Sequence, residues 1–361
     1  MVYEMKNEKS GPQVEALALG SDTLISTPQL RAVPKVELHL HLEGSISPER
    51  IIEFHERAGS KPPTDDPAAI RRLYTYKNFQ DFSRTLLLGV ASLRRPEDFY
   101  DVVMDIGQQL YEHNTAYAEI TWTPQFYLNR KVPLIEILAA MNAARSHWRE
   151  KAQLEMRWIP DLVRSRPAPA SQIVKWACDP RVREMGVVAL GLGGPEAGYP
   201  ATNFAEVFRY ANERGLPVNP HAGEGGPAHS VRDAIDALNP VRIGHGVSAA
   251  SDPEVVNHVL GNRTALEICL TSNLSLGVVS SLDSHPLRAL INAGVDVTIN
   301  TDDPVLFQTD ITKEYALAIG QCGLTFEELL RTIRTAIDVS YADTEIKVNL
   351  HRKLAQYVST L

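Results

Sequence analysis

The sequence has few cysteines, and their spacing excludes two kinds of site. The three cysteines, Cys178, Cys269 and Cys322, stand far apart and form no C-x-x-C pair. An odd number of scattered cysteines does not build a disulfide framework and suits a reducing compartment. The missing C-x-x-C pair argues against a zinc site made of thiolates.

Long apolar runs and an excess of basic charge are also missing. No run reaches the roughly 18 apolar residues that a membrane-spanning helix needs. The N-terminus lacks the basic and apolar regions of a signal peptide, so we expect a cytoplasmic protein. The chain carries 36 Lys and Arg against 44 Asp and Glu, a net charge of −8. Nucleic acids and anionic membranes favour basic surfaces, so neither is expected as a partner.

The bulk composition is that of an ordinary globular protein. Of the 361 residues, 44% are hydrophobic and 22% are charged, which allows a large core. Residues 1–30 show no clear periodicity, and we expect them to form a flexible leader. The remainder, 31–361, is expected to be a single domain, and the residues leave the oligomeric state open.

Strand-like and helical patterns alternate along the chain. Short apolar runs, most of them rich in β-branched residues or closed by Gly, Pro, Asn or Asp, lie at 36–41, 116–123, 155–162, 187–193, 217–222, 241–246, 265–271 and 295–301. Helical patterns lie between and after them, at 48–58, 97–112, 134–151, 170–178, 203–214, 229–237, 252–261 and 284–293. Eight such alternations predict an α/β fold of the (β/α)8 TIM barrel type.

Two further segments extend this barrel. The stretch 59–96 is longer than a barrel loop needs and predicts a helical insertion after strand one, above the barrel mouth. Patterns at 311–319, 325–337 and 343–359 predict extra C-terminal helices. A nucleotide-binding doubly wound sheet would carry a Gly-rich phosphate loop after the first strand. That place holds His39-Leu40-His41 instead, which favours the barrel.

Polar residues stand at the ends of four of the predicted strands. His39 and His41 are two apart on strand one and therefore share a face. His221 follows strand five, His245 ends strand six, and Asp302 follows strand eight. Catalytic groups of a barrel lie at the carboxyl ends of its strands, so this placement predicts one shared site.

The donor set predicts a metal. The imidazoles of His39, His41 and His221 and the carboxylate of Asp302 are ligands that suit one Zn²⁺ per chain, although they also fit other divalent ions. Bound zinc lowers the pKa of a water to about 7, as hydrolysis requires. Glu224 and His245 beside them are candidates for the acid and the base.

Each residue also has a purely structural interpretation. Paired histidines can be hydrogen-bonded core residues, and His245 can be a hydrogen-bonded loop residue. Glu224 can be a carboxylate at a helix N-terminus, and Asp302 with Asp303 can be a helix cap. The shared position at strand ends favours the metal site for all of them. The other histidines, His285 among them, are expected to be solvated or to pack.

The chain resembles the adenosine/adenine deaminase family of the amidohydrolase superfamily, from about residue 34 to the C-terminal helices. The motifs that carry the resemblance are Val36-Glu37-Leu38-His39-Leu40-His41-Leu42-Glu43-Gly44-Ser45, His221-Ala222-Gly223-Glu224, Arg242-Ile243-Gly244-His245-Gly246, Thr271-Ser272-Asn273 and Asn300-Thr301-Asp302-Asp303-Pro304. The resemblance implies zinc-dependent hydrolytic deamination of a 6-aminopurine, which converts adenosine to inosine and ammonia.

The resemblance also implies roles for single residues. Glu224 would protonate purine N1, His245 would orient and deprotonate the water, and Asp302 would assist. The substrate-binding residues would be His41, Glu43, Phe79, Phe82, Gly194 and Asp303. Among these, Asp303 would contact N7, the backbone of Gly194 would contact N3, and Phe79 and Phe82 would cover the purine.

Two departures from the family pattern bear on the substrate. Glu43 stands where nucleoside deaminases usually have Asp, and it is more typical of relatives that act on adenine or on 5′-modified adenine nucleosides such as aminodeoxyfutalosine. Gly193-Gly194-Pro195-Glu196 replaces a more common Gly-Asp-Glu ending. We expect a nucleoside substrate, adenosine or a 5′-modified one, with adenine deaminase as the alternative.

Two other functions are less well supported by the residues. A binuclear amidohydrolase would need a bridging lysine on strand four, and 187–194 contains none. A catalytically silent zinc-binding homologue would be expected to lack Glu224 or His245, and both are present.

Overall fold

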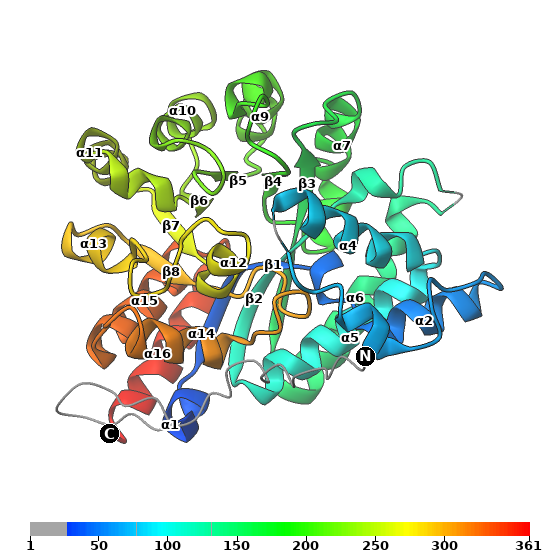
Figure 1. The fold of residues 1–361 in the computed structure, drawn as a ribbon, viewed down its shortest axis with the longest axis horizontal. Helices are drawn as coiled ribbons and strands as arrows, with labels where there is room; N and C mark the ends of the chain where they lie inside the picture. The colour runs from blue at the N-terminus through cyan, green and yellow to red at the C-terminus, as the bar shows by residue number, and fades with distance from the viewer. Residues whose placement is uncertain (1–26, 77, 131) are drawn as a thin grey trace, which may run out of the picture.

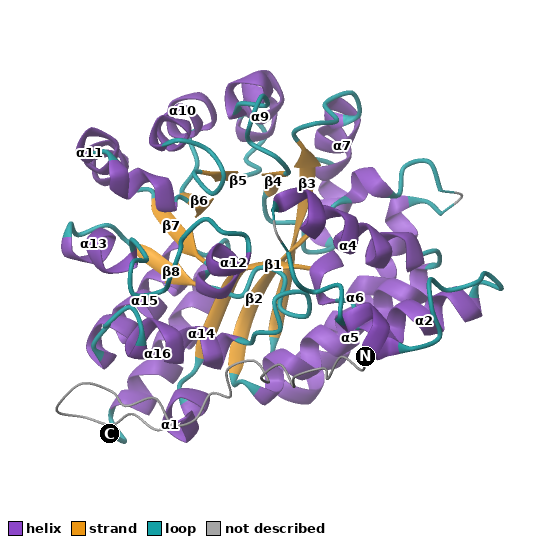
Figure 2. Ribbon diagram, in the orientation of Figure 1, coloured by secondary structure: helices purple, strands orange, loops and turns teal. Residues whose placement is uncertain are grey.

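A computed structural model describes residues 27–76, 78–130 and 132–361. Its parallel strands follow one another in sequence order from β1 to β8, with helices outside them, as a (β/α)8 barrel (Figures 1 and 2). The predicted fold class is confirmed. The strands are β1 (Lys35–His41), β2 (Thr115–Trp122), β3 (Glu155–Val163), β4 (Leu190–Gly193), β5 (Val218–Ala222), β6 (Arg242–His245), β7 (Ala265–Ile268) and β8 (Val297–Ile299).

The helices of the outer layer follow the strands in turn; Figure 1 shows α9, α10 and α11 outside β4 to β7. The α-helices are α1 (Thr27–Ala32), α2 (Pro48–Arg57), α3 (Pro67–Arg71), α4 (Phe79–Ser92), α5 (Pro96–Glu112), α6 (Leu134–Ala152), α7 (Ala170–Ala177), α8 (Pro180–Glu184), α9 (Ala205–Asn212), α10 (Ala228–Leu238), α11 (Pro253–Asn262), α12 (Leu270–Ser275), α13 (Leu287–Asn292), α14 (Ile311–Gly320), α15 (Phe326–Val339) and α16 (Thr344–Val358). Short 3₁₀ helices are η1 (Glu43–Ser45), η2 (Pro124–Phe126), η3 (Ala201–Phe204) and η4 (Val247–Ser251).

The additions to the barrel lie where the sequence predicted them. The insertion after strand one contains α3 and α4, and the chain ends in α14, α15 and α16. Of the expected leader, residues 27–30 lie in α1, where Leu30 is buried, and residues 1–26 lie outside the described part of the chain. No helix of the described residues is long and apolar enough to cross a membrane.

Strands β4, β7 and β8 are each at least three residues shorter than predicted. The run 265–271 was predicted as one strand, but β7 ends at Ile268 and α12 begins at Leu270. In β4 only 190–193 form the strand, because Val187 makes a single bridge to Trp158. In β8 the ladder ends at Ile299, since the residues that follow turn toward β1 and bond there instead.

The barrel closes where the segment after β8 meets β1. The Asp302 backbone donates its N–H to the carbonyl of His39 (2.9 Å) and accepts the N–H of His41 (2.8 Å). Just before it, the side chain of Asn300 accepts the N–H of Leu38 at 2.9 Å. The closure therefore sets Asp302 beside both histidines of β1.

The paired helices α5 and α6 pack closely because α5 carries a glycine at the contact. A Cβ atom on Gly107 would lie 2.1 Å from Nε1 of the buried Trp148 on α6. Alanine in a helix interior is favoured over glycine by roughly 1 kcal/mol. Overpacking of a core costs about 1–3 kcal/mol. The clash with a rigid indole outweighs the gain in helix propensity.

We therefore expect Gly107→Ala to lower the free energy of unfolding by about 1–2 kcal/mol, measured by urea denaturation. Gly261→Ala on α11 is the matched control, since nothing lies within 4 Å of its added Cβ. The control is expected to be as stable as the parent or more stable. A Gly107→Ala protein that is as stable as the control would contradict this account of the contact.

Candidate active site

The imidazoles of β1 and β5 and the carboxylate after β8 meet at the carboxyl end of the barrel. Nε2 of His41 lies 3.2 Å from Nε2 of His39 and 3.2 Å from Nε2 of His221. Oδ1 of Asp302 lies 3.3 Å from Nε2 of both His39 and His41. The predicted ligand set is therefore brought together around one point.

The outer nitrogens of two rings are held by other groups. Nδ1 of His39 lies 2.9 Å from Oε2 of Glu267, and Nδ1 of His221 lies 3.1 Å from the carbonyl of Leu192. Because carboxylates and carbonyls only accept hydrogen bonds, both Nδ1 atoms carry hydrogen. In the neutral form of each ring, which is the form that binds a metal, the Nε2 lone pair then points at the shared centre. Converging lone pairs beside the buried carboxylate of Asp302 fit a bound cation.

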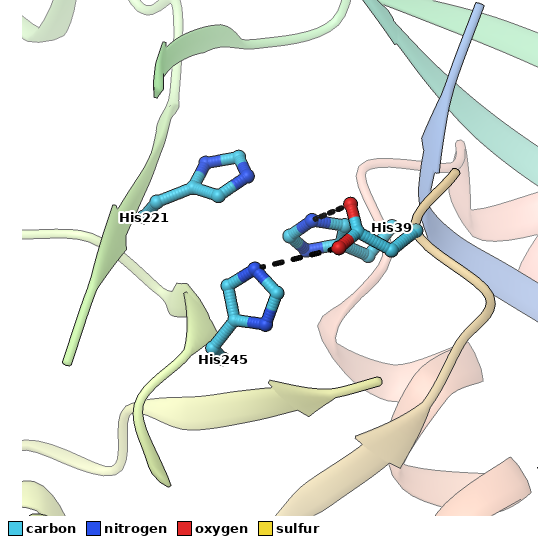
Figure 3. Close-up of side chains that lie close together, drawn as sticks. His39, His221 and His245 are labelled. Carbon is cyan, nitrogen blue, oxygen red and sulfur yellow. Dashed lines mark ion pairs between the residues drawn. The ribbon is translucent and has the colours of Figure 1, made fainter. Parts of the chain in front are cut away.

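His245 joins this cluster from the end of β6. It forms a compact group of possible metal-binding atoms with His39, His221 and Asp302, and Figure 3 shows the three rings turned toward one another. Its Nε2 lies 3.6 Å from Oε1 of Glu224 and 3.9 Å from Oδ2 of Asp302. His245 therefore faces both the predicted acid and the predicted metal ligand.

Two of these residues adopt a backbone conformation that favours glycine. His245 has φ 61° and Asp302 has φ 66°. Left-handed backbone at non-glycine residues is uncommon, costs about 1–3 kcal/mol, and clusters at functional sites. The rest of the fold holds both residues in this strained geometry.

The turn that carries Glu224 is fastened by a second glutamate. The carboxylate of Glu196 accepts the backbone N–H groups of Gly223, Glu224, Gly225 and Gly226 at 2.8–3.1 Å, and the hydroxyl of Ser230 at 3.0 Å. Burial opposes its ionisation, but the Gly223 hydrogen bond and the charge of Arg164 outweigh this and keep the pKa of Glu196 below its usual range. Glu196 is thus a fixed anion behind the turn.

The carboxyl groups of the site differ in protonation. Burial, together with the nearby charge of Asp302, raises the pKa of Glu224 to about 8. The same two causes raise the pKa of Asp303 well above its usual value. Burial also disfavours the charged form of Asp302, but the hydrogen bond and charge of His39 hold its pKa well below the usual range. Neutral Glu224 therefore faces anionic Asp302.

Asp303 is placed by a close approach of the η1 backbone. A Cβ atom on Gly44 would lie 1.7 Å from Oδ1 of Asp303, so only glycine fits there. The backbone N–H groups of Val305 and Leu306 also donate to the carbonyl of Gly44. The Glu-Gly pair after β1 therefore fixes the loop after β8.

The cluster opens into a pocket of about 180 Å³. All the predicted site residues line it except His39, which lies beneath His41. Those lining residues are His41, Glu43, Phe79, Phe82, Gly194, His221, Glu224, His245, Asp302 and Asp303. Ser165 and Arg166 of the loop after β3 line it as well, and so does Phe126 of η2.

An aromatic group from α4 and from the loop after β8 covers one side of the pocket. Phe82 of α4 stacks on Phe307 with ring centroids 5.3 Å apart and touches Phe79 at 5.7 Å. Tyr76 packs edge-on against Phe82 and Phe307, and its hydroxyl donates to the carbonyl of Leu306 at 3.2 Å. The insertion is thereby joined to the loop after β8 that carries Asp303.

Glu43 is buried in the pocket wall. Its Oε1 accepts the backbone N–H of Thr123 (2.9 Å) and the hydroxyl of Tyr127 (3.1 Å). Burial raises its pKa to about 7 despite these hydrogen bonds. Asp161 on β3 lies in the same wall, and its buried Oδ1 has no hydrogen-bond partner among the described residues.

The sequence did not reveal the residues behind the histidines. Glu267 on β7 binds His39 and also accepts Nε of the buried Arg242 on β6, whose Nη2 donates to Glu119 on β2. A charged residue inside the apolar run 265–271 was the available signal for Glu267. Cys269 follows β7 and is a buried core residue. His285, expected to be solvated or packed, is buried and hydrogen-bonded to Asn273.

A family model described as adenosine deaminase matches residues 34–357. The chain belongs to the adenosine deaminase family. The expectation of a hydrolase acting on a C–N bond is thereby confirmed. An aminodeoxyfutalosine deaminase of Streptomyces avermitilis is 34% identical, over 91% of this chain and 92% of its own length. An adenine deaminase of Rhodospirillum rubrum is 36% identical, over 90% and 97%.

Solved structures of deaminases share the fold. The crystal structure of an adenine deaminase from Arthrobacter aurescens superposes with a TM-score of 0.86 at 27% identity, covering 91% of this chain and 100% of the other. The relatives in the family thus include proteins named for two different substrates, adenine and aminodeoxyfutalosine.

The contact between Glu267 and His39 predicts an effect on metal binding. Groups behind a metal ligand change affinity by about 10- to 100-fold when they are replaced. We expect Glu267→Gln to weaken the binding of a divalent metal by that factor, because an amide holds the Nδ1 hydrogen of His39 less strongly than a carboxylate does. Competition with a chelator measures the affinity.

Glu155→Gln is the matched control for this experiment. Glu155 also lies on a barrel strand and is paired with Arg157 at 2.7 Å, but it does not line the pocket. Its variant is expected to bind the metal as the parent does. Equal affinity in Glu267→Gln and Glu155→Gln would show that Glu267 does not support the metal site.

Proposed function

We propose that this protein is a zinc-dependent deaminase of an adenine nucleoside, one modified at the 5′ position or adenosine itself, which releases ammonia from C6 of the purine. The observation that carries the proposal is the convergence of three imidazole Nε2 atoms and a carboxylate at one end of a pocket that also contains Glu224. Membership in the adenosine deaminase family supports the same reaction.

His39, His41, His221 and Asp302 would hold one zinc ion per chain. Zinc, when bound, supplies Lewis-acid activation that brings the pKa of a water to about 7. Strand β4, Leu190–Gly193, offers no lysine to bridge a second metal, so the proposed site is mononuclear. A nitrogen and oxygen donor set of this kind suits zinc.

Glu224 is proposed as the proton donor to purine N1. Its neutral state suits this role, because only a protonated carboxyl has a hydrogen to give. Protonation at N1 makes C6 electrophilic, and a water adds to C6 before ammonia leaves. His245, whose Nε2 lies 3.6 Å from Glu224 and 3.9 Å from Asp302, is proposed together with Asp302 to orient this water and, between them, to accept its proton.

The purine is proposed to lie between Asp303, which contacts N7, and the backbone of Gly194, which contacts N3. Phe79 and Phe82 cover the ring. Both aromatic residues and both polar contacts line the same pocket. Glu43 lies in its wall, toward the sugar end of the substrate.

A nucleoside is preferred because the pocket extends beyond the purine contacts to Ser165, Arg166 and Phe126. The similarity to aminodeoxyfutalosine deaminase supports a substrate with a 5′ substituent. Adenine is the second candidate, and the similarity to adenine deaminases favours it. A silent homologue is disfavoured, because Glu224 and His245 are present and face one another at 3.6 Å.

Replacement of the proposed proton donor tests the chemistry. Glu224→Gln should retain fold and zinc but lose about 10²-fold or more in kcat, the usual scale for general acid–base catalysis. Elemental analysis should find one zinc per chain in the variant and in the parent. The matched control is Glu213→Gln, on the exposed end of α9, which should keep normal kcat. Normal turnover by the Glu224 variant would remove this residue from the mechanism.

A panel of substrates tests the nucleoside assignment. Adenine, adenosine, deoxyadenosine and 5′-modified adenine nucleosides, including aminodeoxyfutalosine, are compared by kcat/KM from ammonia release. A site with polar groups for a sugar should discriminate by up to about 10⁴-fold against a substrate that leaves them unpaired. Free adenine is therefore expected to be much poorer than the best nucleoside. If adenine equals or exceeds every nucleoside, the protein is an adenine deaminase.

A further inference from the structure

The Thr271-Ser272-Asn273 segment has no role in the proposed chemistry, yet Asn273 contacts His245. Asn273 follows β7 in the chain and is fully buried. Its Nδ2 lies 3.2 Å from Nδ1 of His245, and its Oδ1 lies 3.1 Å from Nε2 of His285. The backbone carbonyl of Asn273 also accepts the N–H groups of Val278 and Val279, which holds this residue in place.

The hydrogen bonds that run from His245 through Asn273 and His285 end at a backbone N–H group, which can only act as a donor. The N–H of Leu287, the first residue of α13, donates to Nδ1 of His285 at 3.0 Å. The first N–H groups of a helix have no partner inside the helix, so this one needs an outside acceptor. A backbone N–H only donates, so Nδ1 of His285 carries no hydrogen and Nε2 of the neutral ring does.

The direction of every other hydrogen bond follows. Nε2–H of His285 donates to Oδ1 of Asn273, so the amide nitrogen faces His245. The amide N–H then donates to Nδ1 of His245, which must be an acceptor. The reversed amide would require both nitrogens of His285 to accept, which a neutral imidazole cannot do. Burial, with a smaller effect of His245, lowers the pKa of His285 to about 4, which agrees with a neutral ring.

We propose that Leu287, His285 and Asn273 form a positioning relay that fixes the neutral form of His245 with its hydrogen on Nε2. His245 thus presents a hydrogen-bond donor, not a lone pair, to the reacting centre between Glu224 and Asp302. This deepens the proposed function and rests on it, and it divides the two tasks: His245 orients the attacking water by donation, and Asp302, in place of His245, accepts the water's proton.

Asn273→Asp reverses the relay without changing its shape. One carboxylate oxygen still accepts Nε2–H of His285, but the other can only accept from His245. The hydrogen of His245 should therefore move to Nδ1. If donation by Nε2 is required, kcat should fall by about 10-fold or more, while KM changes little. If His245 were instead the base, the variant would keep or exceed the parent kcat, and the proposal would be overturned.

A spectroscopic readout tests the tautomer without substrate. Two-bond ¹H–¹⁵N correlation spectra of the zinc-loaded protein with ¹⁵N-labelled histidine distinguish protonated from unprotonated ring nitrogens. The His245 signals are assigned by their loss in His245→Gln. We expect an unprotonated Nδ1 and a protonated Nε2 in the parent, and the reverse in Asn273→Asp. A protonated Nδ1 in the parent overturns the relay even if the variant folds poorly.

Asn142→Asp is the matched control. Asn142 on α6 is also a partly buried amide that both donates, to Met185, and accepts, from Trp158, but it does not line the pocket. Its variant should keep kcat and the parent His245 spectrum. The spectrum also separates the two proposals: failure to deaminate any purine refutes the proposed function, whereas the tautomer of His245 is measured independently of turnover.

Discussion

The structure depends on one buried cation, Arg242, held between two glutamates inside the barrel. Its guanidinium donates to Glu119 and to Glu267, and it lies 3.9 Å from the ring centre of Tyr341. A buried charge is tolerated only when it is paired and its hydrogen-bonding groups are satisfied. Glu267 in turn binds His39. The ion pair therefore joins the interior of the barrel to the proposed metal site.

Through this ion pair the C-terminal segment supports the active site, although it lies far from the pocket. The carbonyl of Val339 accepts Nη1 of Arg242 at 2.9 Å, and the N–H of Tyr341 donates to Glu119 at 2.6 Å. The turn between α15 and α16 thus completes the hydrogen bonds of Arg242 and Glu119. Through Glu267, the same bonds set the ring of His39.

Local sequence patterns predict the fold more completely than they predict the site. The alternation of strands and helices predicts the barrel, because the spacing of hydrophobic residues and the residues that end each element are local properties of the sequence. The ends of strands predict His39, His221 and Asp302 because a barrel gathers those ends. Glu196 and His285 could not be predicted, since their roles arise from contacts between separate elements, such as that between Glu196 and Gly223, which are 27 positions apart. The ends of β7 and β8 were also missed, because side-chain bonds replace the ladder there.

The stacking of Phe82 on Phe307 links the opening of the pocket to the position of the loop that carries Asp303. Phe82 belongs to α4, which covers the pocket, and Phe307 belongs to the loop after β8, which also carries Asp303. Tyr76 ties the same insertion to the carbonyl of Leu306. Moving α4 away to let a molecule in or out would unstack these rings and loosen the segment that carries Asp303. Opening of the pocket and the position of Asp303 are thus linked, so a change that widens the opening also alters the proposed contact of Asp303 with the purine.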